Sequence, residues 1–395
     1  MNDSSTNKWI LPVIVVSQFF CTSLWFAGNA VMPDIIKKFA AAPAFLANLT
    51  SAVQFGFITG TLVFALFTIA DRFSPSKVFF ACAVIAALLN LAIIIQGISS
   101  VELLLFRFFT GFFLAGIYPV GMKIASDYYK SGLGKSLSFL VGALVLGTAF
   151  PHLLKSITVQ FSWKYVIYSI SALSVLGGLL MLVLVADGPY RKQGQQLKFT
   201  ALFAGFKNKN FRAAAVGYFG HMWELYTFWA FIPVMLTANK NYYHNSLNVS
   251  FFSFLIIACG ALACVAGGLL SQYFGAKKIA TTALFLSSCC CLLSPFFLFS
   301  SSVPMLIGFL FFWGLVVIAD SPLFSALVAQ NVPQQSRGTS LTMITCIGFS
   351  ITIISIQLLN LLADIINAQY IYMILAIGPA VGLIALLNNK KTNQL

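Results

Sequence analysis

Charged side chains are scarce in this sequence, and their scarcity excludes most soluble folds. Only 8% of the 395 residues are Asp, Glu, Lys or Arg, whereas 59% are hydrophobic. A soluble domain carries about 25% charged residues. A chain this apolar needs lipid as its solvent, where every backbone polar group must find an internal partner. Apolar runs of about 20 residues therefore predict an all-α integral membrane fold, not a β-barrel.

Residue patterns of catalytic and metal sites are also missing. All eight Cys lie within apolar runs, and none forms a metal-ligand pattern with nearby His residues. Neither a His-Glu-x-x-His motif nor a Gly-x-Ser-x-Gly motif occurs. We expect the Cys to be small buried hydrophobic side chains. The sequence thus predicts a protein that is not an enzyme and has no metal and no cofactor.

Twelve apolar spans follow one another along the chain, each long enough to cross a hydrocarbon core of about 30 Å at about 1.5 Å per residue. We expect them near residues 9–31, 46–69, 77–98, 101–124, 136–158, 163–186, 211–236, 249–271, 278–300, 303–329, 338–362 and 368–388. A polar segment separates the first six spans from the last six. It predicts an N-terminal half at 1–186, a cytoplasmic linker at 187–210 and a C-terminal half at 211–395.

Lys and Arg residues predict which loops face the cytoplasm, because cytoplasmic loops carry an excess of them. With both termini placed in the cytoplasm, sixteen of the 23 Lys and Arg fall in inner segments. Four fall in outer loops, namely Lys37, Lys38, Lys164 and Lys240. The same rule explains the net charge of +14, so we expect a lipid bilayer as partner and no nucleic acid.

Matching landmarks in the two halves indicate an internal duplication. The polar loop at 70–77 corresponds to the loop at 271–278, at an offset of 201. Tyr118-Pro119 corresponds to Ser321-Pro322 at an offset of 203, and residues 134–137 correspond to 338–341 at an offset of 204. Two parallel six-helix repeats are typical of secondary transporters, which bind their substrate near the midplane between the repeats.

Three motifs are similar to motifs of the major facilitator superfamily. Residues 69–72 read Ile-Ala-Asp-Arg and are followed by Lys77, residues 107–111 read Arg-Phe-Phe-Thr-Gly, and residues 163–165 read Trp-Lys-Tyr. The chain resembles that superfamily over nearly its whole length. The resemblance implies twelve transmembrane helices in two pseudo-symmetric six-helix halves, with Asp71 and Arg72 as gating residues. We expect the transporter to be a monomer.

Two further stretches indicate a subgroup. Residues 24–30 and 220–226, the latter reading Gly-His-Met-Trp-Glu-Leu-Tyr, resemble a bacterial subgroup labelled nitrate/nitrite-like or sugar-phosphate-permease-like. That resemblance implies a multi-pass protein of the bacterial inner membrane. Span five lacks the Gly-Pro pair that ends the corresponding motif of drug/proton antiporters, and glycine-rich nitrate signatures are not evident.

Ionisable residues within apolar spans are costly, and they usually mark a substrate or proton pathway. Glu224 and His221 lie one helical turn apart, and we expect them to carry the coupling proton together with Asp320. Counting residues puts Arg107 and Glu224 each roughly 12 Å below the outer face, across a central cavity. The full set of expected substrate-binding residues is Arg107, Trp25, Gln54, Tyr118, His221, Tyr226 and Gln357.

The predicted function is a proton-coupled secondary transporter that moves a small organic anion, with protons and that solute as its partners. A carboxylate would match the guanidinium of Arg107, and a citrate-type siderophore fits the same electrostatics. His152 and Lys155 either form a basic vestibule for anions or snorkel at the interface, as Lys123 is expected to do at the inner end. Proton-driven efflux of amphipathic compounds and uncoupled uniport stay open.

Overall fold

The computed structural model describes residues 8–42, 44–129, 133–191, 205–333 and 336–388, and these residues form helices and their connections without any strand. They group into two compact units, the described residues within 1–196 and 248–261 and the described residues within 197–247 and 262–395. Residues 192–204, the greater part of the expected linker, lie outside the described residues. The expected division of the chain into two halves at this linker stays a prediction.

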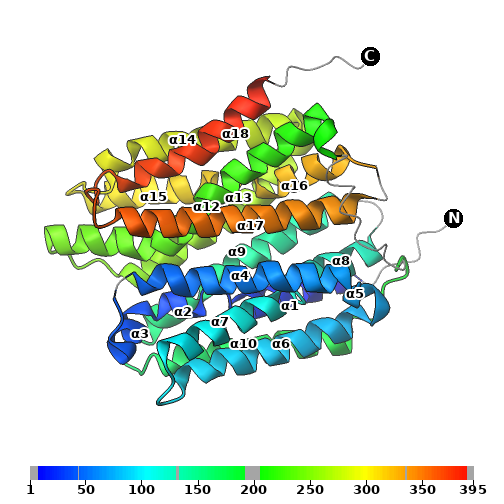
Figure 1. The fold of residues 1–395 in the computed structure, drawn as a ribbon, viewed down its shortest axis with the longest axis horizontal. Coiled ribbons are helices and arrows are strands. Elements are labelled where there is room, and N and C mark those ends of the chain that lie inside the picture. The colour runs from blue at the N-terminus through cyan, green and yellow to red at the C-terminus, as the bar shows by residue number, and fades with distance from the viewer. Residues whose placement is uncertain (1–7, 43, 130–132, 192–204, 334–335, 389–395) are drawn as a thin grey trace. The chain divides into compact units, whose positions relative to one another are not determined.

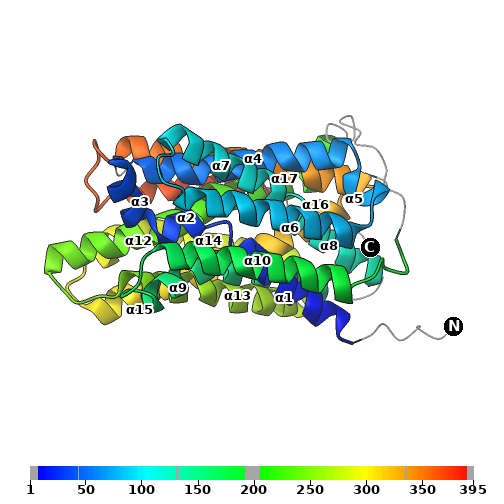
Figure 2. The same cartoon turned by 90° about the horizontal axis from the view of Figure 1, so that it is seen from below.

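The helices of the first unit follow the first six predicted spans (Figure 1). They are α1 (Ile10–Thr22), α2 (Ala27–Ala30), α3 (Met32–Phe39), α4 (Phe45–Leu66), α5 (Ile69–Arg72), α6 (Pro75–Leu91), η1 (Ala92–Ile94), α7 (Ser100–Leu114), α8 (Tyr118–Tyr128), α9 (Leu133–Ile157) and α10 (Lys164–Leu184). The long helices pack in the order α4, α7, α6, α10, α1 and α9, and most of this order can be followed in Figure 2.

The second unit contains α12 (Lys209–Tyr243), α14 (Ala276–Phe297), α15 (Val303–Val316), α16 (Ser321–Gln330), α17 (Arg337–Leu362), η3 (Ile371–Ala376) and α18 (Ile377–Asn388). Helix α13 (Val249–Phe274) contributes residues to both units. Helix α12 is the centre of the second unit, because α16, α17 and α18 all pack against it.

Ten helical stretches of the described chain are long and apolar enough to cross a membrane, which confirms the all-helical membrane fold. The other two predicted spans differ in form from the expectation. The span expected at 9–31 is broken by turns at residues 23–26 into α1 and α2, and α3 follows with Pro33 in its first turn. The span expected at 211–236 is part of the 35-residue helix α12.

Glycines allow the backbones of neighbouring helices to approach closely in both units. In the first unit a Cβ atom at Gly56 of α4 would lie 1.8 Å from the carbonyl oxygen of Phe108 in α7. In the second unit a Cβ atom at Gly220 of α12 would lie 2.3 Å from the carbonyl oxygen of Gly378 in α18. Small residues at helix contacts are common in membrane proteins, where close backbone packing replaces the hydrophobic effect between helices.

Hydroxyl groups of α17 fix α12 at the segment 220–226. Thr352 Oγ1 donates a hydrogen bond of 3.0 Å to Met222 O, and Ser355 Oγ donates one of 2.6 Å to Trp223 O. The indole of Trp223 donates to Ile374 O in η3 at 3.2 Å. These contacts on two sides define the rotation of α12, and the rotation decides where Glu224 and His221 point.

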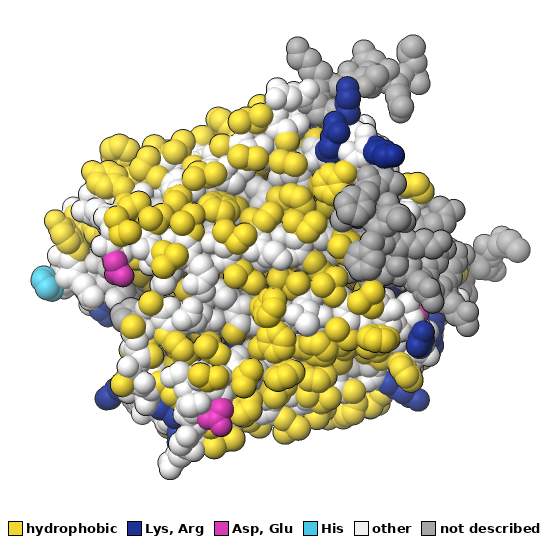
Figure 3. Space-filling model, in the orientation of Figure 1, with side chains coloured by type: hydrophobic (Ala, Val, Ile, Leu, Met, Phe, Trp, Pro, Cys, Tyr) yellow, Lys and Arg dark blue, Asp and Glu magenta, His cyan; other side chains and the backbone are white. Residues whose placement is uncertain are grey.

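The outer surface matches a bilayer as solvent. Figure 3 shows hydrophobic side chains along the lengths of the helices and Lys and Arg side chains near the helix ends. Large exposed side chains on helix faces include Leu88, Leu262 and Phe296. Exposed apolar side chains of this size are expected where lipid tails replace water.

Candidate functional site

Glu224 of α12 is fully buried and accepts hydrogen bonds from three donors of the second unit. Trp313 Nε1 of α15 donates to Glu224 Oε1 at 2.6 Å, and Cys291 Sγ of α14 donates to the same oxygen at 3.3 Å. Ser287 Oγ of α14 donates to Glu224 Oε2 at 2.8 Å. The ring of Phe228 packs on the ring of Trp313 with centroids 4.6 Å apart. Lys and Arg are absent from the described contacts of this carboxylate.

His221 lies one turn before Glu224 but has a different partner. Its Nδ1 atom lies 2.8 Å from Asp320 Oδ1, and both side chains are only 1% exposed. Asp320 occupies the turn between α15 and α16, where its backbone oxygen accepts the amide hydrogens of Leu323 and Phe324. Within the described part of the chain, His221 Nε2 and Asp320 Oδ2 have no hydrogen-bond partner.

The second unit therefore holds two ionisable arrangements within one turn of α12. The arrangement around Glu224 depends on residues that the sequence did not single out. Trp313 sits in an apolar run and is indistinguishable there from a packing residue, and the same holds for Ser287 and Cys291 in α14. Only their position on helices that face Glu224 gives them a role, and that position comes from helix packing.

Arg107 of α7 is fully buried and contacts the break between α1 and α2. Its Nη2 atom donates to Trp25 O at 2.6 Å and to Leu24 O at 3.1 Å, and Nη1 donates to Asn90 Oδ1 at 3.3 Å. Asn90 in turn donates to Ser171 Oγ at 2.9 Å. Carbonyl groups of a broken helix need such donors within a membrane. The guanidinium therefore stabilises the break, and only its Nε atom has no partner among the described residues.

The other expected substrate-binding residues are divided between the two units. Trp25 packs on Phe57 with ring centroids 4.8 Å apart, and Tyr226 packs on Trp229 and Phe349 at 5.2 and 5.0 Å. Gln54 on α4 is fully buried, and neither of its amide atoms has a partner in the described chain. Tyr118 and Gln357 are half-buried, at the start of α8 and on α17. Whether these residues bind a solute stays a prediction.

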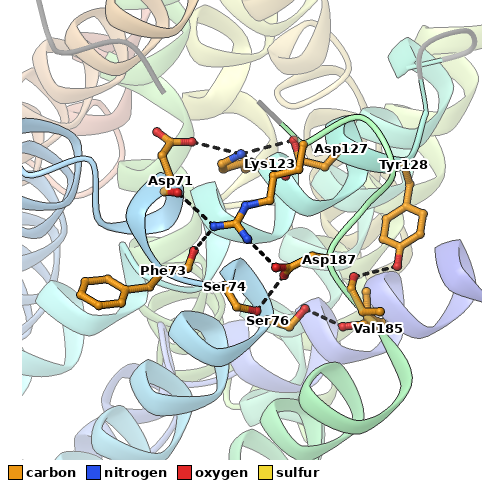
Figure 4. A network of polar contacts seen from close by, with 11 residues as sticks. Asp71, Phe73, Ser74, Ser76, Lys123, Asp127, Tyr128, Val185 and Asp187 are labelled. Carbon is orange, nitrogen blue, oxygen red and sulfur yellow. Dashed lines mark hydrogen bonds and ion pairs between the residues drawn. The ribbon is translucent and has the colours of Figure 1, made fainter. Parts of the chain in front are cut away.

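Charged residues form a network at one end of the first unit (Figure 4). Lys123 of α8 lies 3.1 Å from Asp71 and 3.0 Å from Asp127. Arg191 donates to the backbone oxygens of Asp71 and Phe73 at 3.0 and 2.7 Å, and it also pairs with Asp187. Lys123 was expected to snorkel, but these two carboxylates give it direct partners. We name this set, Asp71, Lys123, Asp127, Asp187 and Arg191, the ion-pair network.

The side chain of Arg72 is exposed, and no described ion pair joins it to this network. The two residues expected as a basic vestibule also have other environments. Lys155 pairs with Asp34 of α3 at 2.6 Å, and His152 is buried with its Nε2 atom unpartnered among the described residues. In the described part of the chain, no three His, Cys, Asp or Glu residues are grouped so that they could hold a metal ion.

Comparisons with known proteins agree with this architecture. The family model described as Major Facilitator Superfamily matches residues 14–356 and 214–394. The solved structure of the nucleoside transporter NupG is similar with a TM-score of 0.73 at 15% identity, covering 97% of this chain and 100% of that one. The proton:xylose symporter XylE is similar with a TM-score of 0.76 at 12% identity, covering 99% and 97%. No curated protein matches the sequence significantly. The chain belongs to the major facilitator superfamily, and it is a multi-pass membrane transporter, not an enzyme.

Proposed function

We propose that this transporter is proton-coupled and that Glu224 carries the coupling proton. The observation behind the proposal is the environment of Glu224, a buried carboxylate with three neutral donors and no cation among its described contacts. An unbalanced negative charge at this depth is costly, and binding a proton removes it. A carboxylate that alternates between such a site and water will load and release protons.

The pair of His221 and Asp320 offers a second proton site. With a proton on His221 the pair is neutral overall, and without it Asp320 is a buried charge with one unpartnered oxygen among the described atoms. The first repeat lacks this chemistry, because the offset of 203 places Gln18, Cys21 and Ile117 opposite His221, Glu224 and Asp320. The ionisable set thus favours the second unit as the coupling unit.

Substrate-dependent proton movement tests this proposal. Purified protein is reconstituted in vesicles with a pH-sensitive dye inside, and solutes are added outside without a pH gradient. A transported solute is expected to change the internal pH, and the change should vanish when a protonophore is present. Uptake of a labelled solute with no pH change would indicate uniport and would overturn the coupling proposal. Opposite pH changes distinguish symport from proton-driven efflux.

The geometry gives less support to the expected organic-anion substrate than to proton coupling. A carboxylate binds a guanidinium through two parallel N–H donors. In Arg107 both terminal nitrogens already contact Leu24, Trp25 and Asn90. We therefore infer a positioning role for Arg107, and a carboxylate or siderophore substrate would have to bind through other residues. Location in a bacterial inner membrane with both termini in the cytoplasm stays a prediction from the sequence.

We further propose that the ion-pair network takes part in gating. Each of its ion pairs is partly exposed, so each contributes about 1 kcal/mol or less. That energy is too small to decide folding but shifts a two-state equilibrium about fivefold. Asp71→Asn should therefore change the transport rate severalfold and leave the thermal midpoint nearly unchanged.

The matched control for Asp71→Asn is Arg72→Gln, because Arg72 is the adjacent residue and no described ion pair joins it to the network. It should transport at the normal rate. Transport assays in vesicles and thermal unfolding in detergent measure the two quantities separately. If both variants slow transport equally, the network is not the gate and the polar loop acts through another contact.

A further inference from the structure

Basic side chains gather at the end of the second unit where α12, α14 and α17 begin. The described first turn of each of these helices has no acidic residue. Figure 3 shows Lys and Arg side chains near the start of α12, with no Asp or Glu beside them among the described residues in view. We name this set the basic end, and its members are Lys207, Lys209, Arg212, Lys277, Lys278 and Arg337.

Hydrogen bonds between the helices place their starts at one end of the unit. Ser287 of α14 donates to Glu224 of α12 at 2.8 Å, so these two residues lie at the same level. Lys278 is nine residues before Ser287, and Arg212 is twelve residues before Glu224. At about 1.5 Å per residue both basic residues lie on the same side of that level, about 14 and 18 Å away. Hydroxyl groups of α17 bond to successive residues of α12, so α17 runs parallel to it and begins at the same end.

Acidic residues of the second unit all lie away from the basic end. Residues 197–247 and 262–395 contain three of them. Glu224 and Asp320 are buried in the interior, and Asp364 follows the opposite end of α17. Acidic side chains of the same unit therefore do not balance the basic end. The positive ends of the helix dipoles add to its potential.

The corresponding loop of the first unit does have acidic partners. The offset of 201 between the duplicated loops pairs Lys278 with Lys77 and pairs Gln272 with Asp71. Asp71 belongs to the ion-pair network, which contains two further Asp residues. The second copy of the loop thus keeps the lysine and lacks the acid. Balancing its charge is left to another molecule.

The surface beside Lys278 is apolar and exposed, which favours one kind of anion. Tyr273 and Phe274 at the end of α13 are 83% and 56% exposed, and Leu269 and Leu270, one turn earlier, are exposed as well. Nζ of Lys278 lies 5.7 Å from the centroid of the Phe274 ring. Exposed aromatic side chains are typical of the level of lipid headgroups. A free anion would use only the basic groups, whereas an anionic phospholipid would use the apolar surface too.

We propose that the basic end binds anionic phospholipids of the adjoining leaflet, with their phosphate groups at Arg212 and Lys278 and acyl chains along the exposed residues of α13. The bound lipid offsets the repulsion between the starts of α12 and α14 and so stabilises the second unit. The positive-inside rule explains how such residues act during membrane insertion, but it requires no bound lipid after folding. The inference does not depend on proton coupling.

The experiment titrates lipid into delipidated full-length protein in an uncharged detergent. Phosphatidylglycerol should raise the thermal midpoint by several degrees, whereas phosphatidylcholine with the same acyl chains should not. In Arg212→Gln/Lys278→Gln the same shift should need at least about tenfold more phosphatidylglycerol, because two basic groups are lost. Hydrogen exchange supplies a local readout. Phosphatidylglycerol should slow exchange at the starts of α12 and α14 in the wild type and not in the variant.

The matched control is Arg72→Gln/Lys77→Gln, which removes one Arg and one Lys from the duplicated loop of the first unit. All four substituted side chains are exposed. The control should respond to phosphatidylglycerol like the wild type, because the Asp residues of the ion-pair network offset the charges at this loop. If the variant with both changes at the basic end cannot be purified, Arg212→Gln and Lys278→Gln alone should each weaken the response about fivefold.

Each of four results would overturn the proposal. Equal stabilisation by phosphatidylcholine would show a general effect of lipid. Equal weakening in the test variant and the control would show a response to net charge alone. An unchanged response in Arg212→Gln/Lys278→Gln would remove these residues from the lipid site. Equal stabilisation by inorganic phosphate at the same concentration would indicate a site for free anions in place of a lipid site.

Discussion

Replacing Glu224 with glutamine is expected to abolish solute accumulation against a gradient while leaving exchange of solute across the membrane intact. Glutamine resembles the protonated acid in shape and is neutral, so the variant stays in the proton-loaded form. Its Oε1 atom can still accept from Trp313 and Cys291, which contact a single oxygen of Glu224. The carrier should therefore fold and move solute, but it can no longer bind or release the coupling proton.

The expected effect can be stated as a number. A pH difference of one unit corresponds to about 1.4 kcal/mol per proton, and each 1.4 kcal/mol supports about a tenfold concentration ratio. One proton per solute would therefore give the wild type about tenfold accumulation. For Glu224→Gln the ratio should fall to about one, and counterflow should continue at a rate within a few-fold of the wild type. Both quantities are measured in vesicles with labelled solute.

Ser287 explains why this variant should remain folded. Its hydroxyl donates to Glu224 at 2.8 Å and also lies 3.2 Å from Leu284 O. When glutamine presents an N–H group at this position, the hydroxyl can turn to Leu284 O and accept from the new amide. The same rotation would accompany protonation of the wild-type acid. Both protonation states are then hydrogen-bonded, which a site that loads and releases protons requires.

Glu102→Gln is the matched control, because it makes the same chemical change at the only other glutamate in the sequence. Glu102 completes a capping box with Ser99 at the start of α7 and is exposed. Losing such a cap costs about 1 kcal/mol of stability and removes no buried charge. This variant should accumulate solute normally. Normal accumulation by Glu224→Gln, in contrast, would show that Glu224 does not couple.

The sequence predicted the spans well because each must be apolar over about 20 residues. It also indicated Glu224, His221 and Asp320 as candidate site residues, because ionisable side chains are conspicuous in apolar runs. It did not show that His221 pairs with Asp320 while Glu224 binds Trp313. Residue spacing along one helix gives the face of a side chain, but which helix covers that face depends on packing between segments far apart in the chain.

Arg107 shows the same limit of reasoning from sequence, which does not reveal the partners of a side chain. Its depth could be counted along the span, and the family resemblance drew attention to it. Its role depends on the turn at residues 23–26, which the apolar run at 9–31 does not reveal. Gln18 and Gln54 are a different case. They were visible as polar residues in spans, but only the structure shows that no described protein group uses their amides.

Arg107→Ala should be the most destabilising substitution in the first unit. It removes the donor at 2.6 Å from Trp25 O, the donor at 3.1 Å from Leu24 O and the partner of Asn90. Each buried acceptor that loses its donor costs about 1–3 kcal/mol, so the total loss is about 3 kcal/mol or more. Thermal unfolding in detergent should show a midpoint lower by several degrees, or the protein should fail to accumulate in membranes.

Arg107→Lys keeps the test usable if the alanine variant does not fold. Lysine retains the charge but offers a single ammonium group in place of a planar fork, so it cannot serve both backbone oxygens and Asn90 with the same geometry. Its midpoint should fall between those of the alanine variant and the wild type. Arg212→Ala, at an exposed position of α12, should change stability by less than about 0.5 kcal/mol.

Ligand binding separates a positioning role of Arg107 from direct contact with the solute. If Arg107 only stabilises the break between α1 and α2, then Arg107→Lys loses stability but keeps the midpoint shift that a bound solute produces. If Arg107 holds an anion, the variant keeps its stability and loses the shift caused by carboxylates. The first result follows from a guanidinium that already contacts Trp25, Leu24 and Asn90. The second would restore Arg107 to the substrate site and make the backbone contacts secondary.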